Sequence, residues 1–105
     1  MALLLGIVTT AGREIKRRYP QATFDVLIWD NVGPGDVGNV KTFADGLAKA
    51  GIPEVRMTGL VPDYYEHWTD YVLSRHDQHA NPRMNKIIAD HFTDVVEKYD
   101  AKAGK

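Results

Sequence analysis

The segment from Ala22 to Gly59 constrains the fold of this chain more than any other part of it. It begins with an apolar run rich in β-branched and aromatic residues, Ala22 to Trp29, which is typical of a strand buried on both faces of a parallel sheet. Glycines spaced G-x-G-x-x-G follow, and then a helical pattern from Val37 to Ala50 that stops at Gly51. A second strand candidate, Glu54 to Thr58, comes next. This order predicts a βαβ crossover of about 35 residues.

The N-terminal segment predicts one more buried strand. Its apolar run from Ala2 to Thr9 is continuous rather than alternating, and the helix that follows reaches about Tyr19 and ends at Pro20. Together these elements predict a small Rossmann-like α/β fold, with about three parallel strands in the order β-α-β-α-β, in two or three layers, followed by two C-terminal helices. The strand order is open between 3-2-1 and 2-1-3.

The two C-terminal helices follow from helical periodicity. The first is predicted at residues 63–77, where aromatic and apolar side chains recur on one face. The second begins well, because Asn81 can cap it and Pro82 suits the first helical position, and it continues to about Asp100. We expect a single domain, in which residues 1–59 form the βαβαβ core, residues 60–100 the two helices and residues 101–105 a frayed tail.

The composition is that of an ordinary globular protein, with 44% hydrophobic and 26% charged residues. Thirteen Lys and Arg residues nearly balance fourteen Asp and Glu residues, so no overall field attracts nucleic acid or an anionic membrane. The absence of cysteine excludes disulfides, thiol catalysis and cysteine zinc sites. We therefore expect a cytoplasmic protein that binds neither nucleic acid nor a membrane.

The densest charge cluster, Arg13 and residues 16–18, is typical of a solvated helix face, with an anionic partner as the alternative. It belongs to a segment with a family resemblance. Residues 14–28 (EIKRRYPQATFDVLI) resemble the first helix and second strand of bacterial heptosyltransferases, in which a basic turn leads into an apolar strand. The likeness covers about fifteen of the 105 residues and implies only a sequence pattern common to βαβ units. No catalytic residue is therefore carried over.

The glycine loop and the strand ends suggest a ligand site. In a dinucleotide fingerprint, glycines with this spacing let a phosphate approach the backbone at the start of a helix. Ligands of parallel α/β sheets also bind beyond the carboxyl ends of the strands. The predicted ligand-binding residues are therefore those of the glycine loop and the three strand ends: Thr10, Asp30, Asn31, Gly33, Gly35, Gly38 and Asp63.

The same residues have a purely structural interpretation. Gly33, Pro34 and Gly35 suit a turn, Asp36 suits a helix N-cap, and Gly38 lets a helix lie close to a sheet. Three aspartates at the sheet edge could hold Mg²⁺, but capping explains them equally well, so no metal site is predicted. The cofactor is unknown, and the sequence leaves open whether the protein is an enzyme.

Two functions of different classes result. The first is a small domain that binds a phosphorylated ligand or nucleotide at the glycine loop. The alternative is a non-catalytic interaction or assembly module that works through its aromatic and C-terminal helices. Because a three-stranded sheet with two apolar helices leaves surface to cover, we also expect a homo-oligomer, with a dimer as the simplest form.

Overall fold

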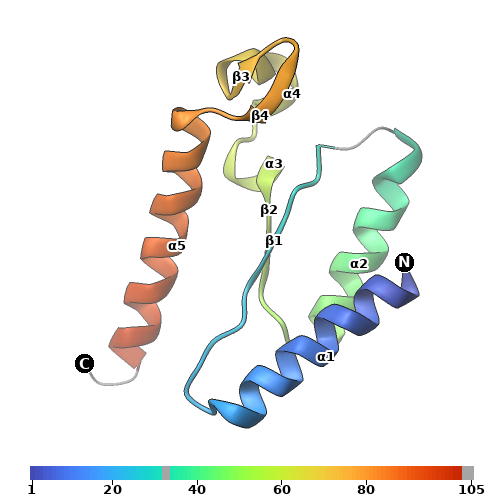
Figure 1. The fold of residues 1–105 in the computed structure, drawn as a ribbon, viewed down its shortest axis with the longest axis vertical. Coiled ribbons are helices and arrows are strands. Elements are labelled where there is room, and N and C mark those ends of the chain that lie inside the picture. Colours follow the sequence, from blue (N-terminus) through green and yellow to red (C-terminus); the bar gives the residue numbers. More distant parts are fainter. Residues whose placement is uncertain (32–33, 103–105) are drawn as a thin grey trace. The chain divides into compact units, whose positions relative to one another are not determined.

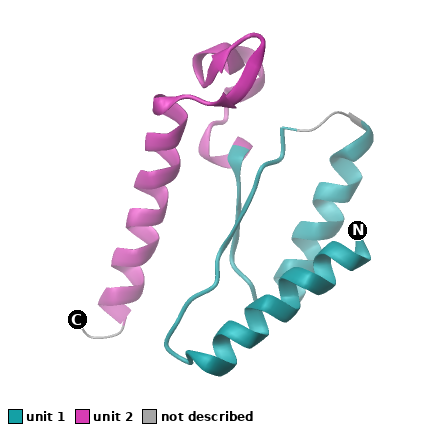
Figure 2. Cartoon of the chain, viewed as in Figure 1, with its two compact units in different colours: residues 1–57 teal, residues 58–105 magenta. Residues whose placement is uncertain are grey.

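The structure is a computed structural model that describes residues 1–31 and 34–102. The chain divides into two compact units, with the boundary between Met57 and Thr58 (Figure 2). The first unit holds α1, β1, η1, α2 and β2, and the second holds α4, η2, β3, β4 and α5 (Figure 1). The short helix α3, Met57–Leu60, begins at the boundary. The expectation of a single domain stays a prediction.

The predicted N-terminal strand is wrong. Residues Ala2–Arg18 form one helix, α1, which joins the predicted strand, turn and first helix into a single element. Leu and Ala are strong helix formers, and the Thr9 hydroxyl donates to the Leu5 carbonyl at 2.8 Å, within the helix itself. Gly12 lies buried inside α1.

A βαβ crossover does form in the first unit. Strand β1, Val26–Ile28, pairs in parallel with β2, Glu54–Arg56, and the helix α2, Val37–Lys49, joins them (Figure 1). Both strands are shorter than predicted, because only three residues of each are paired. The predicted end of α2 is confirmed, since Gly51 takes a positive φ of 72°.

The core of the first unit lies between α1, α2 and β1. Ile28, Phe43, Ala44 and Leu47 are buried, with Leu5 and Val8 of α1 packed against them. Two glycines permit this packing. A Cβ at Gly46 would collide with the Leu5 side chain, and a Cβ at Gly12 would lie 3.0 Å from Phe24 Cδ1.

The predicted helix at residues 63–77 is also wrong. Only Tyr64–His67 are α-helical, as α4, and Trp68–Asp70 form a 3-10 turn, η2. An antiparallel hairpin of β3, Val72–Ser74, and β4, Asp77–Ala80, follows. The Ser74 hydroxyl oxygen accepts the backbone N–H groups of His76 and Asp77 at 3.2 and 3.0 Å, which closes the turn in place of further helix.

The last helix is confirmed and is slightly longer than expected. It is α5, Pro82–Lys102. Asn81 caps it as predicted, because its side-chain oxygen accepts the Met84 backbone N–H at 3.0 Å. Residues 101 and 102 of the predicted tail belong to α5, whereas residues 103–105 lie outside the described residues.

Aromatic packing forms the core of the second unit. Tyr64 and Tyr71 are buried and stacked, with ring centroids 6.1 Å apart, and the Arg83 guanidinium lies 4.8 Å from the centre of the Tyr71 ring. The Tyr71 hydroxyl donates to Asp63 at 2.9 Å.

The predicted fold class is therefore wrong. In the described residues, a two-stranded parallel pair and a two-stranded antiparallel hairpin replace the three-stranded parallel sheet, and most residues are helical. A Rossmann-like sheet is absent from this part of the chain, because the segment expected to supply its first strand is α1. The predicted crossover does form, because the residues that specify it act over short distances: Asp36 before α2, the apolar periodicity within α2 and Gly51 after it.

Candidate functional site

The predicted ligand-binding residues do not all lie at strand ends. Thr10 lies in the middle of α1, where its exposed hydroxyl accepts a hydrogen bond from the Arg13 guanidinium at 3.2 Å. Asp63 belongs to the second unit, where it precedes α4 and accepts the Tyr71 hydroxyl. Thr10 and Asp63 were expected near the glycine loop because all three would lie at the carboxyl edge of one parallel sheet. That three-stranded sheet does not form in the described residues.

The other predicted residues that the structure describes lie along the chain between β1 and the first turn of α2. Asp30 and Asn31 follow β1, Gly35 lies in the 3-10 turn η1, Pro34–Asp36, and Gly38 lies in the first turn of α2. Gly33 lies outside the described residues. A Cβ added at Gly35 or at Gly38 would meet no atom within 4 Å, so Gly38 is not needed there for close packing against the sheet.

Asp36 is the N-cap residue of α2, as the structural interpretation predicted, although its side chain makes no capping hydrogen bond. Its carboxylate stands at the helix end to which a phosphate would bind, and this position disfavours an anionic ligand. Within residues 1–31 and 34–102, no group of three or more His, Asp or Glu side chains could hold a metal ion.

The most prominent unexplained surface is one face of α1. Leu3 is 78% exposed, Ile7 59% and Leu4 49%. Leu3 and Ile7 lie opposite the face that carries Leu5 and Val8 into the core, whereas Leu4 lies at the side of the helix, between the two faces. Isolated apolar side chains are common on protein surfaces, whereas several together on one helix mark an interaction site.

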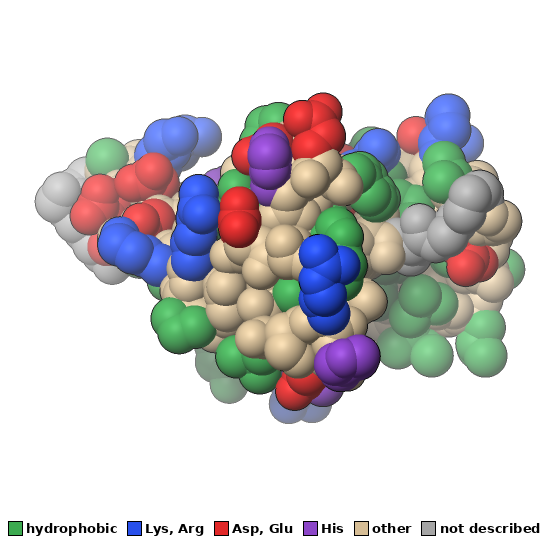
Figure 3. All heavy atoms as spheres, turned by 90° about the horizontal axis from the view of Figure 1, so that it is seen from above, with side chains coloured by type: hydrophobic (Ala, Val, Ile, Leu, Met, Phe, Trp, Pro, Cys, Tyr) green, Lys and Arg blue, Asp and Glu red, His purple; other side chains and the backbone are tan. Residues whose placement is uncertain are grey.

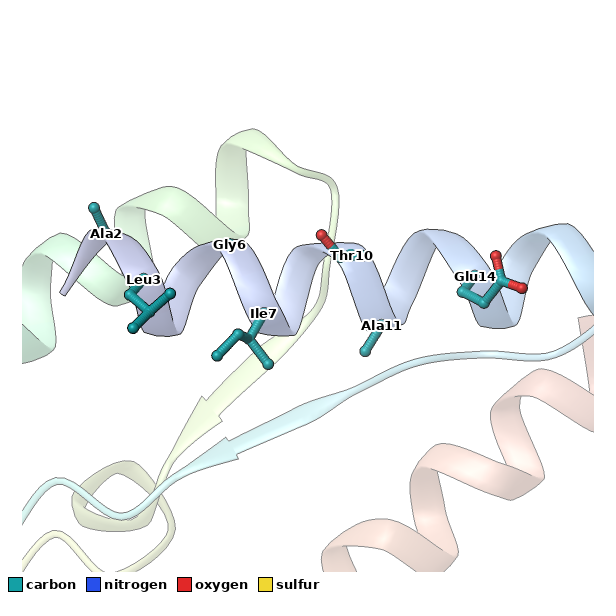
Figure 4. Close-up of a pocket in the computed structure, with 7 residues that line it drawn as sticks. All are labelled: Ala2, Leu3, Gly6, Ile7, Thr10, Ala11 and Glu14. Carbon is teal, nitrogen blue, oxygen red and sulfur yellow. The ribbon is translucent and has the colours of Figure 1, made fainter.

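This face is a shallow, open surface along the helix. Seven residues of α1 line it, and Figure 4 shows Leu3, Ile7 and Ala11 projecting from the same side of the helix. We call it the α1 face and define it by its lining: Ala2, Leu3, Gly6, Ile7, Thr10, Ala11 and Glu14. All of these residues except Thr10 and Glu14 are apolar or glycine. The N-terminal half of the α1 face therefore has no charged side chain.

Gly6 belongs to the α1 face and does not pack against the core. A Cβ added at Gly6 would meet nothing within 4 Å, unlike one at Gly12 or Gly46. A glycine inside a helix costs about 0.8–1 kcal/mol relative to alanine. Nothing in the packing of the described residues explains why that cost is tolerated here.

The C-terminal end of α1 is charged. Glu14 accepts hydrogen bonds from Arg17 at 2.6 and 3.0 Å and from Arg18 at 2.7 Å. The hydrogen bond from Arg17, followed by that from Arg18, lowers the pKa of the Glu14 carboxyl group. Charge elsewhere is mixed, and on the surface drawn in Figure 3 basic and acidic side chains are interspersed.

The sequence analysis missed the α1 face because it assigned residues 2–9 to a buried strand. A helical signal was nevertheless present. Leu3, Ile7 and Ala11 recur at intervals of four on one side, and Leu5, Val8 and Gly12 follow helical spacing on the other.

No protein-family model matches the chain, and the searches of curated proteins and of solved structures found no match either. The part of the chain that the structure describes contains no helix long and apolar enough to cross a membrane.

Proposed function

We propose that this protein is a non-catalytic interaction module, and that the α1 face is its working surface. The observation that carries the proposal is the exposure of Leu3 and Ile7 on a helix that is anchored to the core by its opposite side. This surface differs from the aromatic and C-terminal helices that the sequence suggested: most of residues 63–77 are not helical, whereas the C-terminal helix forms as α5. The absence of cysteine fits the cytoplasmic location that we also propose.

Burial of this face would supply useful binding energy. Removing one Leu or Ile side chain from water is worth about 1.5–3 kcal/mol. Leu5 and Val8 hold α1 against the core, so the helix backbone that carries the outer side chains is already fixed before a partner arrives. A preordered surface loses little conformational entropy on binding, which favours affinity.

Site-specific photo-cross-linking in the cells that naturally contain the protein tests this proposal. A photoreactive amino acid replaces Ile7 in one variant and Val37, also 59% exposed, in the matched control. We expect polypeptide adducts from position 7 that position 37 does not give. Equal adduct patterns at the two positions, or none at either, would contradict an interaction surface on α1.

A second candidate function is the binding of a phosphorylated ligand at the N-terminus of α2. It is favoured by the β1–α2–β2 crossover, in which the glycine-containing turn η1 directly precedes the N-terminus of α2. A phosphorylated ligand would bind the first backbone N–H groups of α2 beside Gly35 and Gly38.

Thermal denaturation with inorganic phosphate, ADP or a sugar phosphate tests the second candidate. A ligand at a hundred times its dissociation constant adds about 2.7 kcal/mol of stability, which raises the melting temperature by several degrees. Gly35→Asp should abolish that rise, whereas the control Gly59→Asp, at an equally open glycine in the α3 helix, should retain it. No rise with any of these compounds counts against this function.

A further inference from the structure

We infer that the α1 face binds the same face of a second copy of this chain, with the two α1 helices antiparallel and crossing near Ile7. The inference rests on the proposed function and names its partner. It differs from the general expectation of a dimer by assigning the surface, the orientation and the residue at the twofold axis.

Large and small side chains alternate along the α1 face in such a way that two antiparallel copies place a large side chain opposite a small one. Leu3 and Ala11 lie four residues on either side of Ile7. In an antiparallel pair centred on Ile7, Leu3 of each copy therefore lies over Ala11 of the other. The two Ile7 side chains meet at the axis, and Gly6 beside them leaves room for the helices to approach. Such an isologous contact buries the most exposed apolar residues of α1 in both copies.

The charges on α1 favour the antiparallel orientation. A parallel pair would place Arg13 and Arg17 of one copy beside the same residues of the other, and like charges repel. In the antiparallel pair the centres of the two basic clusters are about 25 Å apart at 1.5 Å per residue. That separation is well beyond the Debye length of about 8 Å at physiological salt.

Glu14 provides a second complementary contact. In the antiparallel pair its carboxylate lies beside the first turn of the second copy's α1. That turn has no acidic residue and no side-chain cap. A carboxylate near the N-terminus of a helix is favourable, because it faces unpaired backbone N–H groups and the positive end of the helix dipole. Each copy supplies this contact to the other.

Cysteine pairing tests the orientation, because the chain has no cysteine of its own. Ile7→Cys alone should form a disulfide-linked dimer under mild oxidation, since the two positions face each other at the axis. A mixture of Leu3→Cys and Ala11→Cys proteins, one carrying a longer tag, should form the mixed dimer faster than either forms a dimer with itself. Val37→Cys is the control for random collision.

Each outcome of the pairing experiment decides something. Faster self-pairing of Leu3→Cys than of the mixture indicates a parallel pair and overturns the antiparallel assignment. Pairing no faster than that of Val37→Cys overturns the second copy as the partner. If position 7 still gives photo-adducts with other polypeptides, the proposed function survives this failure. If it gives none, both fail together.

Sedimentation equilibrium tests the surface without a cross-link. We expect the unmodified protein to dimerise, and Ile7→Glu to raise the dimer dissociation constant about tenfold or more, because it puts a charge at the apolar axis. Val37→Glu should leave the dissociation constant unchanged, and circular dichroism verifies that both variants are folded. A monomer at every concentration, or equal effects of the two variants, would overturn the inference.

Discussion

At the scale of single residues, the glycines of this chain serve different purposes that their spacing does not reveal. Gly46 and Gly12 lie where another side chain approaches the helix, and Gly51 takes a backbone conformation that other residues avoid. Gly38 and Gly6 have open space where a Cβ would be. Only the surroundings of each glycine separate these cases.

A pair of glycine substitutions in α2 should have opposite effects on stability. Gly46→Ala places a methyl group against Leu5, and the overpacking cost of about 1–3 kcal/mol exceeds the helix propensity gained, which is worth up to about 1 kcal/mol. Gly38→Ala meets nothing and gains helix propensity, worth up to about 1 kcal/mol. Urea denaturation should therefore show a lower unfolding free energy for the first variant and a higher one for the second. Equal shifts would mean that Leu5 does not pack tightly on Gly46.

Tyr71 should make the protein sensitive to alkaline pH. The hydrogen bond to Asp63, followed by burial, raises the pKa of the Tyr71 phenol above its ordinary value of 10.0. A folded-state pKa above the unfolded one gives stability that is complete below about pH 10 and is lost as pH rises through the folded pKa. The melting temperature should fall over that range in the unmodified protein and fall less in Tyr71→Phe. At pH 7 the variant should also have a lower melting temperature than the unmodified protein, because Phe cannot form the hydrogen bond to Asp63.

At the scale of elements, Asn81 joins the hairpin to α5. Its side-chain oxygen caps the helix, while its side-chain nitrogen donates to the Asp70 carbonyl at 2.8 Å and to the Val72 carbonyl at 3.3 Å. One amide therefore fixes where the strand region ends and the helix begins.

Substitutions of Asn81 should separate these two roles. Asn81→Ala removes the cap and the two donated bonds, and loss of a cap alone costs about 0.5–2 kcal/mol. Asn81→Asp keeps an oxygen for the Met84 N–H but cannot donate when ionised, so its unfolding free energy should lie between those of the other two proteins. Urea titrations at pH 7 measure all three. Equal loss in the two variants would show that the donated bonds dominate.

At the scale of the whole molecule, each compact unit has its own fully buried side chains: Leu47 and Met57 in the first and Met84 in the second. Each unit also has one of the two tryptophans, Trp29 and Trp68. Fluorescence from single-tryptophan variants can therefore follow each unit by itself.

Leu47→Ala should lower the unfolding free energy reported by Trp29 by about 2–5 kcal/mol, since it leaves a cavity in the core of the first unit. Met84→Ala should have a comparable effect on the transition reported by Trp68. The control Leu73→Ala removes a side chain that is 57% exposed and should change either value by less than about 0.5 kcal/mol. A small effect of Leu47→Ala would contradict its position in the core.

The sequence by itself determined the elements whose signals act over a few residues. The helix after Asp36 ends at Gly51 because that residue tolerates a positive φ, and α5 begins at Pro82 because Asn81 caps it. The parallel pairing of β1 with β2 was also predicted correctly, although its length was not.

Only the tertiary structure decided the remaining elements and the candidate site. An apolar run such as residues 2–9 can be buried either as a strand in a sheet or as one side of a helix, and local propensity does not choose between them. The choice came from contacts distant in sequence, Leu5 on Gly46 and Gly12 against Phe24. Because α1 is a helix, several of its apolar side chains point away from the core, and the candidate surface arises from that geometry.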